Sequence, residues 1–163
     1  MGKSAFLADQ AGMHDAITIF LATSTYYPCL LLVDLAVRKL EDAASDLAST
    51  YGWPCLSVGR ELGATLLSEP PARRPGAARR WLEARLREVA PANGSPVLCL
   101  DIDLLFEPTL RLDPLRLLRD ASRATRIVVA WPGSYTDDVL AYAVPEHGHY
   151  RTWRRPDVPI TCL

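Results

Sequence analysis

Pro96-Val97-Leu98-Cys99-Leu100-Asp101 is the stretch of sequence that says most about the fold. It is a short, continuous apolar run that ends on an acid. A run of this kind predicts a strand that is buried on both faces of a parallel sheet. Runs of the same character lie at residues 28–33 and 126–131, and a shorter one lies at 54–58. The sequence therefore predicts a sheet built from several buried strands.

Segments with helical spacing separate these strands. Asp113 is suited to an N-cap and Pro114 to the first position of the helix that follows it. The predicted helices cover residues 35–50, 59–67, 77–89 and 114–124. Strands that alternate with helices predict one α/β domain over residues 1–163, with three α/β/α layers and a mostly parallel central sheet.

The segments between these elements are assigned from local signals. Residues 14–23 fit either a helix or a strand, and we expect residues 1–12 to be loosely ordered. Pro132-Gly133 is expected to end the strand at 126–131, and Pro75-Gly76 to extend a break in the chain that begins near Ser68. Late strands are predicted at residues 139–144 and 157–162.

Composition narrows the class of protein. The formal net charge of the 163 residues is -1, which argues against bulk attraction to nucleic acid or to an anionic membrane. No secretory leader and no apolar stretch of membrane-spanning length is visible, so we expect a cytoplasmic protein that does not enter a membrane. The four cysteines form no C-x-x-C pair, and we expect three of them to be core residues rather than zinc ligands.

Asp101 has the position of a Walker B acid. P-loop enzymes place an Asp at the end of an apolar strand, where it helps to hold Mg²⁺. Asp103 follows two residues later and is a second candidate for such a role. The alternative is structural, because Asp residues at strand ends also cap turns. The pattern alone leaves both interpretations open.

The companion motif of a P-loop, G-x-x-x-x-G-K-[ST], is missing after the first strand. The chain there reads Asp34-Leu35-Ala36-Val37-Arg38-Lys39-Leu40-Glu41 and contains no glycine. The loop requires glycine because its amides converge on phosphate in conformations that a Cβ obstructs. Lys39 lies near the position of the phosphate-binding lysine and is the one candidate for nucleotide contact, although a solvent-facing role is the alternative.

Several motifs in the second half of the chain resemble one protein family. The first is Leu98-Cys99-Leu100-Asp101-Ile102-Asp103-Leu104-Leu105-Phe106, and the most specific are Leu112-Asp113-Pro114-Leu115-Arg116-Leu117-Leu118 and Ala130-Trp131-Pro132-Gly133. Ser122-Arg123 and the segment 142–151 continue the likeness. Together they resemble the BrxF family, the small P-loop proteins of type 3 BREX phage-defence systems, over residues 28–160.

The resemblance implies a role in a multi-gene bacterial defence system. It implies a P-loop-NTPase-like fold and partners that include a large P-loop ATPase, a DNA methyltransferase and a phosphatase-like protein. Members of the family generally carry an intact Walker A motif, from which this chain departs. We therefore expect a degenerate site without a cofactor, and ATP with Mg²⁺ only where Asp101 and Lys39 still function.

Basic residues give further candidates for an interface. Arg73, Arg74, Arg80 and Arg87 lie in the most basic segment, and a stripe of this kind can bind nucleic-acid phosphates. Glu83 and Glu88 lie among them, so a solvated face is the alternative. Arg154 and Arg155 are candidates for contact across a protein interface, in the manner of an arginine finger. The alternative is that they lie in a solvated surface turn.

Two His residues lie close to that second arginine pair. His147 and His149 are one residue apart, but no carboxylate or Cys pattern completes a metal site, so a polar turn is favoured.

Three functional hypotheses follow. The first is an accessory subunit that does not hydrolyse nucleotide and acts through protein contacts, with no catalytic residue of its own. The second is an ATPase, weak or active, that uses Asp101 and Lys39. The third is an adaptor that contacts DNA through residues 73–87. Self-association is compatible with all three.

Overall fold

The computed structural model describes the backbone of residues 2–163 and the side chains of residues 10–163. The elements within this range follow the alternation that the sequence predicts. In chain order they are α1 (Gly2–Ala22), β1 (Cys29–Asp34), α2 (Val37–Tyr51), β2 (Cys55–Ser57), α3 (Val58–Leu67), the 3-10 turn η1 (Pro71–Arg73), α4 (Arg74–Val89), β3 (Val97–Leu100), η2 (Asp103–Phe106), η3 (Pro108–Leu110), α5 (Pro114–Ala121), β4 (Ile127–Thr136), β5 (Val139–Tyr142), β6 (Arg151–Arg154) and β7 (Ile160–Cys162).

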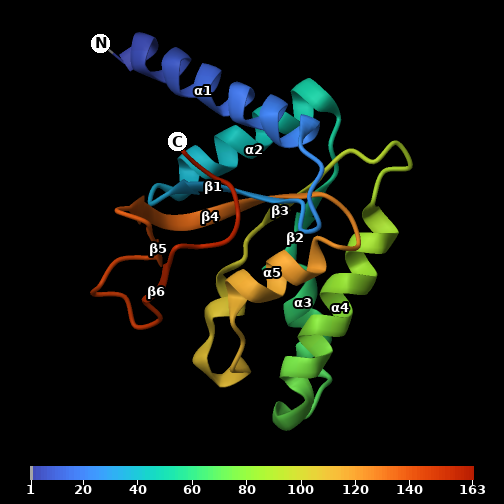
Figure 1. The fold of residues 1–163 in the computed structure, drawn as a ribbon. Coiled ribbons are helices and arrows are strands. Elements are labelled where there is room, and N and C mark those ends of the chain that lie inside the picture. The colour runs from blue at the N-terminus through green and yellow to red at the C-terminus, as the bar shows by residue number, and fades with distance from the viewer. Residues whose placement is uncertain (1) are drawn as a thin grey trace.

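A parallel sheet forms the centre of the molecule (Figure 1). Its strands lie in the order β2-β3-β4-β1-β7, and each neighbouring pair in this order is parallel. The register pairs Leu31 with Val129 and Cys99 with Val129, so the three apolar runs of the sequence lie side by side. The predicted fold class, α/β with a mostly parallel sheet, is confirmed.

Helices cover both faces of this sheet (Figure 1). α1 and α2 pack on one face, where Ile17 and Leu47 are fully buried against alternate residues of β1 and β4. α3, α4 and α5 pack on the other face, where Leu62, Leu82 and Leu118 contribute to the larger core. Because both faces are covered, the central strands carry apolar residues at every position rather than at every second one.

β5 and β6 lie outside this parallel arrangement, and the way β4 reaches them corrects one prediction. β4 does not stop at Pro132-Gly133 but continues to Thr136, and its second half pairs with β5 in an antiparallel manner. Proline is tolerated at this point because β4 passes there from one pairing partner to another. Gly133 is required there, because a Cβ would overlap the carbonyl oxygen of Ala141.

Other boundaries also differ from those predicted. α4 begins at Arg74 rather than at Ala77, because Pro75 lies in its first turn, where a missing N–H costs little. α1 begins at Gly2, well before the predicted residue 14. Leu105 and Phe106, which follow the predicted strand at 96–101, are buried.

Within the part of the chain that the structure describes, no helix has the length and apolar character needed to cross a membrane.

Candidate functional site

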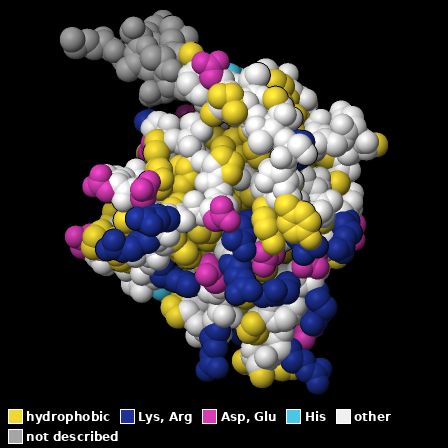
Figure 2. Space-filling view, in the orientation of Figure 1, with side chains coloured by type: hydrophobic (Ala, Val, Ile, Leu, Met, Phe, Trp, Pro, Cys, Tyr) yellow, Lys and Arg dark blue, Asp and Glu magenta, His cyan; other side chains and the backbone are white. Residues whose placement is uncertain are grey.

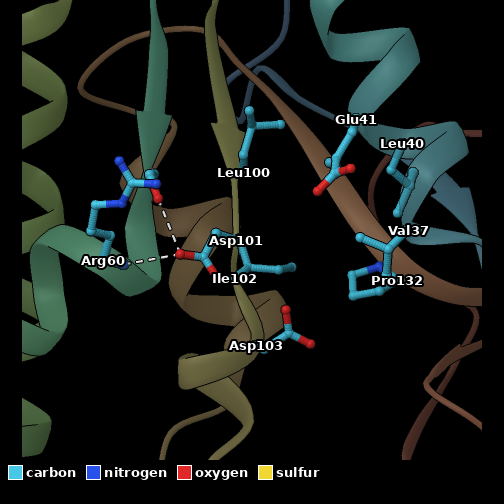
Figure 3. Close-up of a pocket in the computed structure, with 11 residues that line it drawn as sticks. Val37, Leu40, Glu41, Arg60, Leu100, Asp101, Ile102, Asp103 and Pro132 are labelled. Atoms are coloured by element: carbon cyan, nitrogen blue, oxygen red, sulfur yellow. Dashed lines mark hydrogen bonds between the residues drawn. The ribbon is translucent and has the colours of Figure 1, made fainter.

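A cavity of about 360 Å³ lies at the carboxyl ends of β2, β3 and β4, between α2 and α3 (Figure 3). This edge is where open parallel sheets bind ligands. The residues that line it are Val37, Leu40, Glu41, Ser57, Arg60, Leu100, Asp101, Ile102, Asp103, Ala130 and Pro132. Both Asp residues that the sequence singled out are therefore at one cavity.

Asp101 holds the beginning of α3. Its Oδ2 accepts hydrogen bonds from the backbone amide of Arg60 and from the Ser57 hydroxyl, both at 3.0 Å. Its carbonyl oxygen accepts a third from the amide of Gly59 at 2.7 Å. The first amides of a helix have no partner within it and carry partial positive charge, so a carboxylate is stabilising there. The structural interpretation of Asp101 thus has a definite form, in which it caps a helix that comes earlier in the sequence.

The backbone at Asp101 is adapted to this role. Its φ is +56°, a left-handed conformation that Asp tolerates better than most residues. The conformation turns the chain at the end of β3, so that the carboxylate and the carbonyl oxygen both face α3. The end of β3 is joined in this way to α3, the helix that follows its neighbouring strand β2.

Asp103 has a different partner. Its Oδ1 accepts a hydrogen bond of 2.7 Å from the hydroxyl of Tyr142, whose ring is stacked on Phe106 at a centroid distance of 3.6 Å. Burial of the Tyr142 hydroxyl, together with this hydrogen bond, raises the pKa of Tyr142 above its ordinary value of 10.0. Asp103 therefore links the sheet edge to the antiparallel extension formed by β4, β5 and β6.

The junction between β1 and α2 is short and is closed by its own side chains. Only Leu35 and Ala36 separate the strand from the helix. The Asp34 Oδ1 accepts a hydrogen bond of 2.7 Å from the Ala36 amide, and its Oδ2 lies 3.2 Å from the Lys39 Nζ. Lys39 also donates to the carbonyl oxygen of Leu163 at 3.3 Å. Lys39 is thus engaged beside β7 and is not among the residues that line the cavity.

Glu41 brings a third carboxylate to the cavity, one turn into α2. It faces Asp101 and Asp103 across the cavity, whereas Arg60 is the cation that lines it (Figure 3). Three carboxylates against one guanidinium favour positively charged groups and repel polyphosphates. Among the described residues, no group of three or more His, Cys, Asp or Glu side chains is arranged to hold a metal ion.

The motifs that carry the family resemblance serve packing and local structure. Asp113 caps α5 by accepting from the Arg116 amide, and it also accepts from the Trp153 Nε1, both at 3.1 Å. Trp131 is fully buried and donates from its Nε1 to the Ala141 carbonyl at 2.9 Å. The Leu-Asp-Pro-Leu and Ala-Trp-Pro-Gly motifs are therefore explained by the way the β4–β6 extension packs on the segment before α5.

The predicted basic candidates lie in two places. Arg73 lies in η1 at the start of α4, whereas Arg74, Arg80 and Arg87 are carried by α4 itself. Of these, the Arg74 Nε donates to the Glu69 carbonyl at 3.1 Å, and the Arg87 guanidinium lies 3.9 Å from Glu83.

The second pair of basic candidates is at the end of β6. Arg154 and Arg155 are exposed beside a smaller cavity that also touches α5.

His147 and His149 form a turn, as the sequence favoured. The His149 amide donates to the His147 Nδ1 at 3.0 Å, and the His149 Nε2 lies 3.8 Å from the Glu107 carboxylate. This turn lies in the loop between β5 and β6, and the His149 contact joins that loop to Glu107, just before η3.

Sequence reasoning missed the residues that surround Asp101. Ser57 ends β2, whereas Gly59 and Arg60 belong to the first turn of α3, and no spacing in the sequence links them to an acid more than forty positions later. The available signal was Gly59 itself, placed where a strand turns into a helix, since glycine at such a point often marks a close approach of backbone.

Comparison of the chain with models of protein families, with curated proteins and with solved structures found no match.

Proposed function

We propose that this chain is a P-loop-like accessory subunit that does not hydrolyse nucleotide and acts through protein contacts in a BREX-type phage-defence complex. The resemblance of residues 28–160 to the BrxF family supports the pathway, the cytoplasmic location and the class of partners. The observation that carries the loss of hydrolysis is the position of two carboxylates, Asp34 and Asp101, at the beginnings of α2 and α3.

In a P-loop protein, the amides at the beginning of the helix after the first strand bind phosphate. Here the Asp34 carboxylate accepts from the amide of Ala36, two residues away, and holds Lys39 as well. A junction of two residues leaves no glycine loop to surround a phosphate group, and the negative charge of Asp34 opposes one. The residues present at this junction therefore do not fit the phosphates of a nucleoside triphosphate.

The magnesium position is affected in the same way. The Asp101 Oδ2 already accepts two hydrogen bonds from the α3 side, and the nearby Glu41 takes the place where a Mg²⁺-binding hydroxyl would be expected. Asp101 thus stabilises the fold by contacts that a metal ligand would have to give up. This supports the subunit hypothesis over the ATPase hypothesis.

The arrangement of the strands supports the P-loop-like part of the proposal. β1 and β3, the strands that would carry the phosphate loop and the magnesium-binding acid, end at the same edge of the sheet with β4 between them. What this chain lacks is therefore the glycine loop after β1, where the negative charge of Asp34 lies instead. The strand order on which a P-loop site is built is retained.

The test combines a nucleotide titration with a partner assay. Calorimetric titration of ATP with Mg²⁺ into the protein is expected to give no binding at concentrations up to about 1 mM, the weak end of ordinary substrate affinities. Binding in the micromolar range that is lost in Asp101→Asn, a variant that keeps the cap acceptor, would refute the proposal.

The partner assay uses the classes of protein that the resemblance implies as partners. Co-expression with the large P-loop ATPase, the DNA methyltransferase and the phosphatase-like protein, followed by size-exclusion chromatography, is expected to yield a stable complex with at least one of them. Elution of this chain apart from all three would remove the support for an accessory role.

A further inference from the structure

A second cavity, of about 250 Å³, brings together four arginine side chains that the sequence keeps apart. It lies between α5 and the segment that follows β6. Arg116 and Arg119 reach it from α5, and Arg154 and Arg155 reach it from the end of β6. The carboxylates that line this cavity are Asp113 and Asp157, and Asp120 lies 3.7 Å from Arg116 and 3.4 Å from Arg119, so four guanidinium groups meet three carboxylates.

Arg154 and Arg155 are less well paired than Arg85 on α4, whereas Arg116 and Arg119 each have an ion pair with Asp120. On α4, the Arg85 guanidinium donates to Glu61 at 2.7 Å and to Glu88 at 3.1 Å. By contrast, no hydrogen bond or ion pair joins the guanidinium of Arg154 or Arg155 to another side chain in the described part of the chain. The excess of positive charge at the cavity is therefore available to a ligand.

Arg119 is held in position but left incompletely bonded. Its guanidinium lies over the ring of Tyr27 at 4.7 Å, and its side chain is 27% exposed. Its Nε is buried without a hydrogen-bond partner, whereas the terminal nitrogens lie 3.4 Å from Asp120 and 3.7 Å from the largely exposed Asp157. A guanidinium that is fixed by stacking on an aromatic ring is preorganised to meet an oxyanion at its exposed edge.

The positive surface extends beyond this cavity. A neighbouring cavity shares Asp113 and Arg116 with it and adds Arg79 and Arg111. Figure 2 shows basic side chains gathered over α5, with acidic ones among them. We call Arg116, Arg119, Arg154 and Arg155, with Arg79 and Arg111 beside them, the α5 arginine surface.

An exposed aromatic ring lies close to the end of α5. Tyr26 is 64% exposed, and the Arg123 guanidinium lies 4.6 Å from the centre of its ring. Tyr26 lies in the segment after α1, and Arg123 lies just beyond the end of α5. Since Arg123 contacts Tyr26 and Arg119 contacts Tyr27, both rings lie beside α5. A flat aromatic face beside a track of arginines is the combination that binds unpaired bases and their phosphates.

We propose that the α5 arginine surface binds single-stranded nucleic acid. Arg116, Arg119, Arg154 and Arg155 contact successive phosphates, and Tyr26 stacks on a base. The exposed ring favours a single strand over a duplex, whose bases are stacked on one another, and over an acidic protein, which offers no planar base. The proposal differs from DNA contact through α4, and it does not depend on the subunit role proposed above.

The test measures binding of a fluorescein-labelled oligo-dT of about 20 nucleotides by anisotropy, starting near 50 mM salt. Wild-type protein is expected to bind, with an affinity that falls by about 0.7 log units per log unit of salt for each phosphate contacted. The triple variant R116A/R154A/R155A is expected to lose about tenfold or more in affinity and about 2 units of that salt slope. Tyr26→Ala is expected to weaken binding about fivefold or more with an unchanged slope.

The matched control is R73A/R80A/R87A, which removes the same charge from η1 and α4. It is expected to bind oligo-dT within about twofold of wild type, because its side chains lie outside the α5 arginine surface. Circular dichroism melts confirm that each variant folds, and Arg155→Glu alone replaces the triple variant if the latter melts early. Absence of oligo-dT binding near 50 mM salt would overturn the proposal.

Two other results would also overturn it. One is an equal loss of affinity in the α4 control, which would place binding elsewhere or make it nonspecific. The other is stronger binding of a poly-glutamate peptide, or of a duplex of the same length, with the same sensitivity to R116A/R154A/R155A. That result would assign the surface to an acidic protein or to double-stranded DNA instead.

Discussion

Gly59 and Asp101 are in backbone contact across two neighbouring strands. The Gly59 amide donates to the Asp101 carbonyl oxygen at 2.7 Å, and a Cβ on Gly59 would lie 2.8 Å from that same oxygen. The contact explains why the chain has glycine at the second position of α3. It also connects the end of β3 to α3, the helix that the Asp101 carboxylate stabilises.

Replacement of Gly59 by alanine is the first test of this contact. Gly59→Ala is expected to lower the free energy of unfolding by about 1–3 kcal/mol, because backbone atoms of Asp101 must move. Gly63→Ala, on the same helix, is the control: its Cβ would meet only the Leu104 side chain at 3.8 Å, so alanine is expected to be neutral or stabilising. Urea denaturation measures both, and equal stability of the two variants would contradict the contact.

The cap that Asp101 provides is tested by three substitutions at one position. Asp101→Ala is expected to destabilise by about 2 kcal/mol, from loss of the cap and from the cost of a positive φ. Asp101→Gly removes the cap but adopts a positive φ without strain, so the free energy of unfolding is expected to fall by only about 1 kcal/mol. Asp101→Asn keeps an acceptor and is expected to lose less than either. If Asn were as damaging as Ala, hydrogen bonding would not be the source of the stability.

Tyr142 makes the stability sensitive to alkaline pH. Its pKa is raised in the folded state, by burial and by the bond to Asp103, so folding favours the protonated phenol. Its contribution is complete below the unfolded pKa of about 10 and is lost as pH rises from there toward the folded pKa. Tyr142→Phe is expected to destabilise by about 1 kcal/mol at neutral pH and to lose less stability than wild type above pH 10 or so. Parallel stability curves for the two proteins up to the highest pH at which both fold would contradict this.

Gly133 tests the passage of β4 from the parallel to the antiparallel part. Gly133→Ala is expected to destabilise by about 3 kcal/mol, because its Cβ would overlap the Ala141 carbonyl, which also accepts from Trp131. Gly148→Ala serves as control, since nothing lies within 4 Å of its Cβ. Loss of near-ultraviolet circular dichroism from Trp131 should accompany the first substitution only. A stable Gly133→Ala protein would show that β4 and β5 pair differently.

The cysteines divide by reactivity. Cys29 and Cys99 are fully buried, and burial raises the pKa of the Cys99 thiol to about 12 and that of Cys29 further. Cys55 and Cys162 are exposed. Short treatment of the native protein with iodoacetamide, followed by mass spectrometry, is expected to label Cys55 and Cys162, and labelling of the other two should require urea. Modification of Cys29 in the native protein would contradict the buried position of β1.

The central sheet was predictable from the sequence because its signal is local. Each of the runs at 28–33, 96–101 and 126–131 is apolar at every position, and a strand covered on both faces has no other pattern available. The Asp113 cap and the proline after it likewise mark the start of α5 within two residues. The strand end at Pro132-Gly133 was predicted wrongly, since proline and glycine interrupt a strand in general but not where it changes partners.

Which residues form the candidate site was only partly predictable. Asp101 and Asp103 could be found at a strand end, but their partners Arg60 and Tyr142 lie some forty residues away in opposite directions along the chain. The same holds for the α5 arginine surface, where Arg116 and Arg155 meet only because β6 returns to α5.

By itself, the sequence determined the fold class and the absence of a glycine loop after β1, because hydrophobic runs and missing glycines are properties of consecutive residues. The tertiary structure alone decided what the acids do. Asp34 accepts from the start of its own helix, whereas Asp101 accepts from a helix that precedes it by forty residues. A carboxylate takes its role from the donors that surround it, and those donors become neighbours only when the sheet aligns the ends of its strands.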